Sequence, residues 1–411
     1  MKNREIRAYL ENNAGKNILP LSIIENEDLI GSKPIEIIVF YKKKKAISEL
    51  KECLLQTIEY YNLFSSRLIK IGHHQYALQF ASDGFTVNIL PPVEAPVAKL
   101  PIDDIRQSMV HVKTLPGEPL FAVTGFSTQD GTVGAVSCSH AVADGISFFL
   151  FLFAWVSIID GNPFSRPSKQ RLFTGSPLNS GHIDKMFKPS LSKLSNVIQN
   201  RIHYENNIKT YRHTDYFTCE FLNDIKKHAK RGNGDDCISN NQIINAVLMK
   251  KYHQHLLPDT RKIVMRNPVN LRDVHPDIDP LYIGNAYLDC TTEFTKDEVE
   301  NLSVYDIARR LKESIHNAKN ENFVRDMAYL SKYGIEFKSD IFNHYSPDNI
   351  KTDIVSSNIA HLHDLESMGM GSNILDILHV DSAVQTGFVI LKENSRLILV
   401  QTTGMYPFES R

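Results

Sequence analysis

The sequence is organised around the stretch SCSHAVADGISFFLFLFAWVSIIDG at residues 137–161. Residues 132–138 have the pattern of a short, half-buried strand, and residues 146–159 are too long and too apolar for anything but a buried helix. His140, Asp144 and Gly145 fall on the turn between these two elements. Such a turn holds a side chain rigidly and leaves it accessible, so it is the first place to look for chemistry.

Histidine is the side chain best suited to accept a proton near pH 7. As a general base, His140 would deprotonate a hydroxyl or amine that attacks a carbonyl. Asp144 could orient the histidine, cap the helix amides or form an ion pair elsewhere, and Gly145 would let the backbone turn tightly. The alternative is a structural turn, with a hydrogen-bonded histidine and an N-cap aspartate.

Length and composition indicate an ordinary globular protein. Its 411 residues exceed what one core usually supports, so we expect two lobes. The 46 basic and 47 acidic residues balance, which argues against nucleic-acid binding. Five scattered cysteines without a C-x-x-C pair favour a reducing cytosol and no structural zinc. We expect neither a signal peptide, because the first residues are polar, nor a membrane span, because no apolar run reaches ~20 residues.

The remaining patterns predict a mixed α/β chain. Strands are expected at residues 35–41, 120–127, 262–268, 383–391 and 396–403, and helices at 46–61, 105–112, 219–231, 241–256, 303–318 and 321–333. Residues 161–203 are rich in Pro, Ser, Gly and basic side chains, which is typical of a linker. His361 and His363 could share one strand face, but no third ligand is evident, so no metal site is predicted.

The segment SHAVADGISFFLFLFAW resembles the HxxxDG motif and apolar helix of the BAHD acyltransferases. That family belongs to the superfamily of chloramphenicol acetyltransferase, carnitine acyltransferases and condensation domains. The resemblance implies an α/β fold of the α+β type, with two chloramphenicol-acetyltransferase-like lobes. Each lobe would be a mixed sheet with flanking helices, and an active-site tunnel would lie between them. Residues 1–165 would form the lobe with HxxxDG, 166–210 the crossover linker, and 211–411 the second lobe.

A second similar segment is NPVNLRDVHPDIDPLYIGNAYLDC at residues 267–290. It resembles the part of the family in which an arginine pairs with the aspartate of HxxxDG. The resemblance therefore implies that Arg272 pairs with Asp144 and supports the His140 turn; the alternative is a surface arginine in a loop. It also matches Asn285 to the asparagine of the family's Gly-Asn pair, which makes Asn285 a candidate for donor binding or the oxyanion site.

A third segment, with SSN at residues 356–358, is similar to the Ser-Asn pair of bacterial condensation-type and polyketide-associated acyltransferases. The similarity makes Ser356 and Asn358 candidates to bind the donor or its thioester oxygen. A strand end with two polar caps is the alternative. SMGMG at residues 367–371 keeps both glycines of the plant motif DFGWG but lacks its aspartate.

Together these resemblances imply an acyl-CoA-dependent O- or N-acyltransferase of secondary metabolism with His140 as general base. Acyl-CoA or an acyl-carrier thioester would be the co-substrate and a small molecule the acceptor, with no bound cofactor or metal. We expect a cytoplasmic monomer without nucleic-acid or membrane partners. Two alternatives stay open: a free-standing condensation-type enzyme fed by carrier proteins, and a non-catalytic acyl-binding relative. Ser139 stands where condensation domains usually have a first histidine, which favours the CoA-dependent branch.

Overall fold

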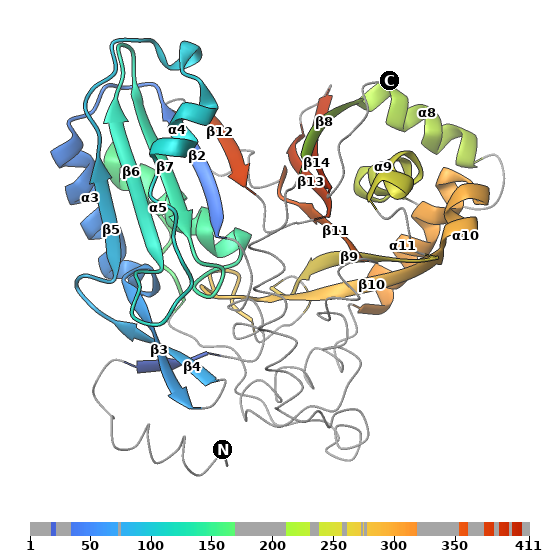
Figure 1. Cartoon of the computed structure of the whole chain (residues 1–411), viewed down its shortest axis with the longest axis horizontal. Coiled ribbons are helices and arrows are strands. Elements are labelled where there is room, and N and C mark those ends of the chain that lie inside the picture. Colours follow the sequence, from blue (N-terminus) through green and yellow to red (C-terminus); the bar gives the residue numbers. More distant parts are fainter. Residues whose placement is uncertain are drawn as a thin grey trace.

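The fold consists of two lobes that lie side by side (Figure 1). The computed structural model describes residues 18–21, 34–72, 75–168, 211–230, 238–256, 261–272, 274, 278–318, 353–360, 374–381, 386–393 and 397–404. Each lobe contains one large mixed sheet with helices packed against it. The expected α/β class with two lobes is confirmed.

The first lobe is built on a five-stranded sheet with the order β12-β2-β7-β6-β5. Its strands are β2 (Ile35–Tyr41), β5 (Phe85–Ile89), β6 (Phe121–Ser127), β7 (Thr132–Cys138) and β12 (Ile374–Asp381). β5 runs parallel to β6, and the other neighbours are antiparallel. β12 comes from the part of the chain expected to build the second lobe, yet it pairs with β2. A late segment therefore completes the first sheet, and the division into residue blocks stays a prediction.

Helices cover both faces of this sheet (Figure 1). α3 (Ile47–Tyr60) and α5 (Gly145–Asp160) share one apolar core with the sheet, and α4 (Ile102–Ser108) packs against the opposite face. α3 and α5 confirm the expected helices. The helix expected at residues 105–112 was placed too late: it begins after Pro101, carries acidic side chains in its first turn, and ends where Met109 adopts an extended backbone.

α5 is the buried helix that the central stretch predicts. The Asp144 side chain caps its first turn by accepting a hydrogen bond from the Ser147 N–H at 2.8 Å. Gly161 ends the helix with a φ of 71°, a left-handed conformation that favours glycine. Most of its side chains between these caps are buried, including Phe148, Phe149 and Phe151. This burial fixes the start of the helix beside His140.

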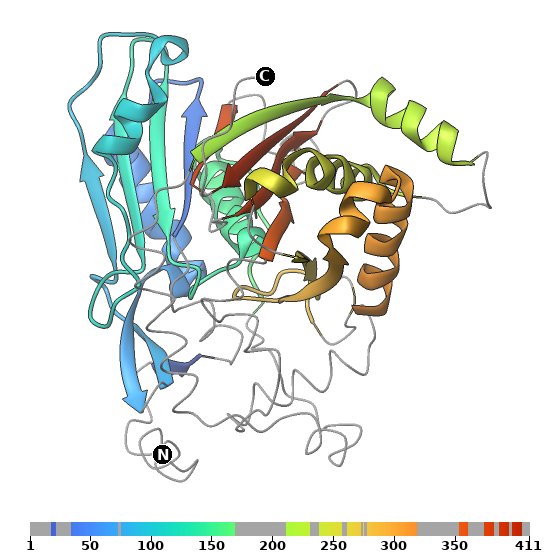
Figure 2. The same ribbon diagram turned by 45° about the vertical axis from the view of Figure 1, so that its right-hand side comes forward.

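The second lobe is built on a six-stranded mixed sheet with the order β10-β9-β11-β13-β14-β8. The strands are β8 (Tyr211–Thr218), β9 (Lys262–Asn270), β10 (Tyr287–Thr295), β11 (Asp353–Asn358), β13 (Gly387–Glu393) and β14 (Leu397–Gly404), and the helices are α8 (Cys219–Lys230), α9 (Asn240–Leu256), α10 (Lys296–Asn301) and α11 (Val304–Ala318). Figures 1 and 2 show these helices on the side of the sheet that faces away from the first lobe. The expected C-terminal hairpin is confirmed as β13 and β14.

A small antiparallel sheet with the order β1-β4-β3 joins β1 (Ile18–Pro20), β3 (Ser66–Gly72) and β4 (Gln75–Phe80). Several expectations lie outside the described residues: the helix at 321–333, most of the linker at 166–210, the SMGMG segment, His361 and His363. In the described part of the chain, no helix combines the length and apolar character that crossing a bilayer requires.

Candidate active site

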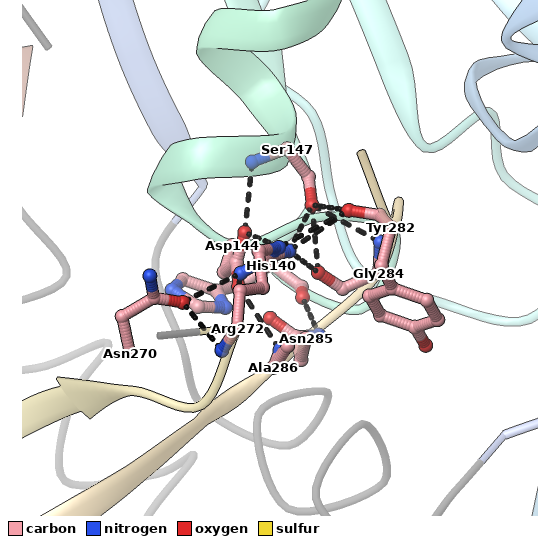
Figure 3. Close-up of polar contacts among 9 residues, drawn as sticks. All are labelled: His140, Asp144, Ser147, Asn270, Arg272, Tyr282, Gly284, Asn285 and Ala286. Carbon is pink, nitrogen blue, oxygen red and sulfur yellow. Dashed lines mark hydrogen bonds and ion pairs between the residues drawn. The ribbon is translucent and has the colours of Figure 1, made fainter. Parts of the chain in front are cut away.

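His140 lies on the turn between β7 and α5, and its side chain is half-buried (Figure 3). The carbonyl of His140 accepts a hydrogen bond from Asn285 Nδ2 at 2.6 Å. The ring of Tyr287 stands edge-on to the imidazole with a centroid distance of 5.8 Å. Ser139 serves the turn itself, because its hydroxyl is 2.7 Å from the Thr114 hydroxyl and accepts from the N–H of Ala141 at 3.2 Å. Hydrogen bonds of the Asn285 and Ser139 side chains thus fix the backbone of the turn on both sides of His140.

Asp144 caps the helix and forms an ion pair. Its Oδ1 accepts from the Ser147 N–H at 2.8 Å and from Arg272 Nη2 at 3.1 Å. Its Oδ2 accepts from Arg272 Nη1 at 2.8 Å and from the Ala286 N–H at 3.0 Å. Both carboxylate oxygens are occupied by these four bonds. Of the three roles considered for Asp144, the cap and the ion pair are observed.

Arg272 reaches this carboxylate from the other lobe, just after β9. The Arg272 and Asp144 side chains retain 2% and 7% of their accessible surface, so the pair is buried. Arg272 also donates to the Ser147 hydroxyl at 2.8 Å and to the Tyr282 carbonyl at 3.0 Å, while Asn270 Oδ1 accepts from Nη1 at 3.2 Å. These additional hydrogen bonds satisfy N–H donors of the guanidinium that the ion pair with Asp144 leaves unused, as a buried arginine requires.

The electrostatics of the pair favour the ionised carboxylate. Burial raises the pKa of Asp144, but the Arg272 charge and hydrogen bonds, together with the N–H groups of Ser147 and Ala286, outweigh it. The net result is a pKa below the usual value for aspartate. Asp144 is therefore a permanent anion at neutral pH, which suits a fixed structural charge.

The loop between β9 and β10 brings the second lobe against α5. Gly284 has a φ of 136°, a conformation that favours glycine, and its carbonyl accepts from the Ser147 hydroxyl at 2.8 Å. The Gly284 N–H donates back to the same hydroxyl oxygen at 3.1 Å. Ile283 beside it is packed into the core of the first lobe. The two lobes therefore meet at the His140 turn.

Ser356 and Asn358 have other contacts. The buried Ser356 hydroxyl donates to Asn245 Oδ1 on α9, on the helix side of the six-stranded sheet. Asn358 Oδ1 accepts from the Ala360 N–H at 3.0 Å. These contacts are those of a strand end with polar caps, the alternative considered for this segment. The structure joins His140, Asp144, Arg272 and Asn285 in one network, and a donor-binding role of Ser356 and Asn358 stays a prediction.

Sequence reasoning overlooked three members of the network: Ser147, Asn270 and Tyr287. Ser147 lies three residues after Asp144 on the predicted helix, so the N-cap spacing could have identified it. Asn270 and Tyr287 carry no such signal, because their role depends on the loop between β9 and β10. Gly145 begins α5 with a helical backbone, which any residue can adopt, so its expected role in a tight turn stays a prediction.

Within the described ranges, no group of three or more His, Cys, Asp or Glu side chains is arranged to hold a metal ion. The four described cysteines, Cys53, Cys138, Cys219 and Cys290, form no disulfide with one another. The expectation of a reaction without metal stays a prediction.

Solved structures share this two-lobed architecture. TRI101 of F. sporotrichioides, in complex with coenzyme A and T-2, matches with a TM-score of 0.66 and 13% identity over 94% of this chain and 95% of that chain. Vinorine synthase gives 0.62 and 16% over 95% and 92%. The condensation domain of the monacolin K polyketide synthase MokA gives 0.57 and 10% over 95% and 93%. The fold is that of the BAHD-like acyltransferases and condensation domains.

The family assignment rests on a match over most of the sequence. No curated protein sequence significantly matches this chain. A family model described as the Transferase family matches residues 11–392, which is most of the chain. The chain belongs to this Transferase family, the family of BAHD-like acyltransferases.

Proposed function

We propose that this protein transfers an acyl group from a CoA thioester to a hydroxyl or amine of a small molecule, with His140 as the general base. One observation carries the proposal: the turn that bears His140 is fastened to the second lobe by the buried Asp144–Arg272 pair. A buried ion pair is expensive to desolvate, and its place beside a half-buried histidine fits the need to fix a catalytic base. Asp144 and Arg272 are then positioning residues.

The proposed reaction needs one base and no covalent intermediate. His140 takes the proton of the acceptor hydroxyl or amine while the acceptor oxygen or nitrogen bonds to the thioester carbonyl carbon. The carbonyl becomes a tetrahedral oxyanion. When the oxyanion collapses, the C–S bond breaks, and the CoA thiolate recovers the proton from His140. Placing both substrates at one histidine supplies the proximity on which such a transfer depends.

Asn285 is the best placed candidate for donor binding. Its side chain is fully buried, and one Nδ2 hydrogen is used on the His140 carbonyl. Its Oδ1 has no hydrogen-bond partner among the described residues. This amide oxygen can accept a hydrogen bond beside the turn, so it suits an N–H of the acyl donor, such as an amide of the pantetheine arm. It does not suit an oxyanion, which needs hydrogen-bond donors. Ser356 would have to release Asn245 before it could donate to an oxyanion.

Two features favour CoA over a carrier protein as donor. TRI101, which shares the fold, is solved with coenzyme A. Ser139 stands where condensation domains usually have a first histidine, and its hydroxyl is hydrogen-bonded to the Thr114 hydroxyl. The MokA condensation domain shares the fold as well, so a condensation-type enzyme is the second candidate function.

The test is a donor panel with mass spectrometry. The purified full-length protein is incubated with acyl-CoAs or acyl-carrier thioesters and with a mixture of small alcohols and amines, and free thiol is measured. We expect thiol release from acyl-CoA that requires an acceptor, with a product heavier by one acyl group. Release from carrier thioesters and not from CoA would favour the condensation type. No transfer from either donor would favour the non-catalytic relative.

A further inference from the structure

A short segment of the first lobe, residues 109–114, connects α4 to the turn that carries His140. We call this segment the strap; it belongs to neither a helix nor a strand of the described structure. Met109 and Val112 are buried, whereas His111 is exposed. Met109 packs into the apolar core that α4 shares with the five-stranded sheet. The strap therefore lies on the face of the sheet that α4 covers.

Buried hydroxyl groups of the sheet hold the backbone of the strap. The Val110 N–H donates to Thr124 Oγ1 on β6 at 3.0 Å. The Val112 N–H donates to Ser137 Oγ on β7 at 3.0 Å. Buried backbone N–H groups need acceptors, and here fully buried side chains of two neighbouring strands supply them. The contacts advance along the strap toward the C-terminal end of β7.

A buried carboxylate anchors the strap to the sheet. Glu36 on β2 is 3% exposed. Its Oε1 accepts from the Ser137 hydroxyl at 2.9 Å and lies 2.8 Å from Nδ1 of His111. The other ring nitrogen of His111 lies 3.1 Å from the Arg106 carbonyl on α4. A carboxylate inside a sheet is costly unless it is hydrogen-bonded, and the partners of Glu36 are the strap and the strand beneath it.

The strap ends at the His140 turn. The Thr114 hydroxyl is 2.7 Å from the Ser139 hydroxyl, and Ser139 Oγ accepts from the Ala141 N–H at 3.2 Å. Ser139 and Ala141 are the two residues that flank His140, so the contact with Thr114 acts on the backbone at that position. Arg272 reaches the same turn from the second lobe. The turn is therefore held from both lobes, and the strap is the support that comes from the first.

We propose that the strap positions His140 for acyl transfer, with Thr114 acting through Ser139 and with Glu36 as the anchor. This inference rests on the proposed function, in which His140 is the general base. Thr114, Ser139 and Glu36 are then positioning residues, because they act through the backbone of the turn. Residues that only set the place of the base alter kcat and leave the KM values of the substrates nearly unchanged.

Thr114→Val and Thr114→Ser test the contact with Ser139. Valine keeps the shape of threonine without the hydroxyl, and serine restores the hydroxyl. In the full-length protein, with the acyl-CoA that the parent uses best, we expect Thr114→Val to lose about 10- to 100-fold in kcat. The KM values of acyl-CoA and of the acceptor should stay close to those of the parent, and Thr114→Ser should recover most of the kcat. A folded Thr114→Val protein with the kcat of the parent would overturn the proposal.

Thr132→Val is the matched control. Thr132 lies at the opposite end of β7, and its buried hydroxyl likewise holds a loop, because it donates to the Lys43 carbonyl at 3.0 Å. We expect this variant to keep the kcat of the parent. If Thr132→Val loses as much kcat as Thr114→Val, the loss follows from removing any hydroxyl at this strand, and the specific role of Thr114 is wrong.

Glu36→Leu tests the anchor. Leucine fills the buried position but cannot bind Ser137 or His111. We expect a kcat between those of Thr114→Val and the parent. Combined with Thr114→Val, it should cost no further kcat, because both changes act through one contact. If Glu36→Leu fails to fold, His111→Ala breaks the same contact from the solvent side. The parent kcat in the folded anchor variant, or additive losses in the double variant, would remove Glu36 from this role.

Hydrogen exchange separates the strap from the proposed function, because it needs no turnover. Exchange of the backbone amides in residues 137–142 is followed by mass spectrometry. Loss of the Thr114 hydroxyl loosens this turn, so we expect faster exchange in Thr114→Val than in the parent or in Thr132→Val. If the parent transfers no acyl group, the proposed function fails, and the exchange result alone decides whether the strap holds the turn. Unchanged exchange in Thr114→Val would show that it does not.

Discussion

Arg272 and Asp144 are joined by two parallel hydrogen bonds, Nη1 to Oδ2 at 2.8 Å and Nη2 to Oδ1 at 3.1 Å, across 128 residues of sequence. Bidentate pairs of this kind fix both distance and orientation. Here they connect the first turn of α5 to the loop between β9 and β10. This ion pair therefore connects the two lobes at the turn that carries His140 (Figure 3).

Removing either partner of this pair should destabilise the protein strongly. Asp144→Ala or Arg272→Ala leaves a buried charge without its partner, which costs about 3–5 kcal/mol. The double variant should lose less free energy of unfolding than the sum of the two single losses, because it leaves no unpaired charge buried. Urea unfolding of the four proteins measures this coupling.

Arg309→Ala is the control for that cycle. Arg309 pairs with Glu313 at 2.9 Å on the exposed face of α11, where an ion pair contributes little. We expect its unfolding curve to match that of the parent. Strictly additive losses in the Asp144–Arg272 cycle would show that the buried pair is not a coupled unit.

Asp144 should also make stability depend on pH in the acid range. Its pKa is lowered in the folded protein, whereas in the unfolded chain it is near ~3.9. The stability it contributes is therefore present above about pH 4 and is lost as the pH falls through the lower folded pKa. The free energy of unfolding of the parent should fall more steeply with acid than that of Asp144→Asn. Identical slopes for the two proteins would contradict the lowered pKa.

Ser147→Ala should weaken the junction without removing a charge. The hydroxyl accepts from Arg272 and from the Gly284 N–H and donates to the Gly284 carbonyl. Its loss leaves buried donors unsatisfied and should cost about 1–3 kcal/mol. Ser157→Ala is a matched control, because Ser157 is buried in the same helix and outside this network. Equal unfolding midpoints for the two variants would mean that Ser147 adds nothing specific.

Asn285→Ala should lower kcat and leave the fold intact. Without the hydrogen bond from Nδ2, the His140 carbonyl is less firmly held, and a misplacement of about 1 Å can cost ~10²-fold in rate. Because this bond acts on His140, its loss should affect kcat more than the KM of the acyl acceptor, and the proposed contact of Asn285 with the donor would appear separately as a higher KM for acyl-CoA. A kcat within a factor of about two of the parent would remove Asn285 from this role.

The sequence predicted the elements whose signal is local. The apolar run of α5 and the amphipathic face of α3 are each visible within a few residues. The strand β7 was also predicted, but as a half-buried one; six of its seven residues are buried, because apolar cores cover both faces of the sheet. The start of α4 was misplaced by three residues, because a proline and two aspartates set it more strongly than the apolar spacing did.

Contacts between residues far apart in the sequence could be predicted only from the resemblance to the BAHD family, or could not be predicted. The pairing of Arg272 with Asp144 has no local signal, and it was implied by the family. The pairing of β12 with β2 connects residues more than 300 positions apart, and no periodicity encodes such a register. The contact of Tyr287 with His140 likewise depends on how the loop between β9 and β10 folds.

The central claim is that His140 is the general base, and the kcat of His140→Ala tests it most directly. Acyl transfer from the best acyl-CoA is measured beside His316→Ala, which changes an exposed histidine on α11, with circular dichroism and urea unfolding as checks of the fold. We predict that His140→Ala loses about 10²–10⁴-fold in kcat with native spectra, and that His316→Ala retains full turnover. A folded His140→Ala protein with near-parent kcat would contradict the account.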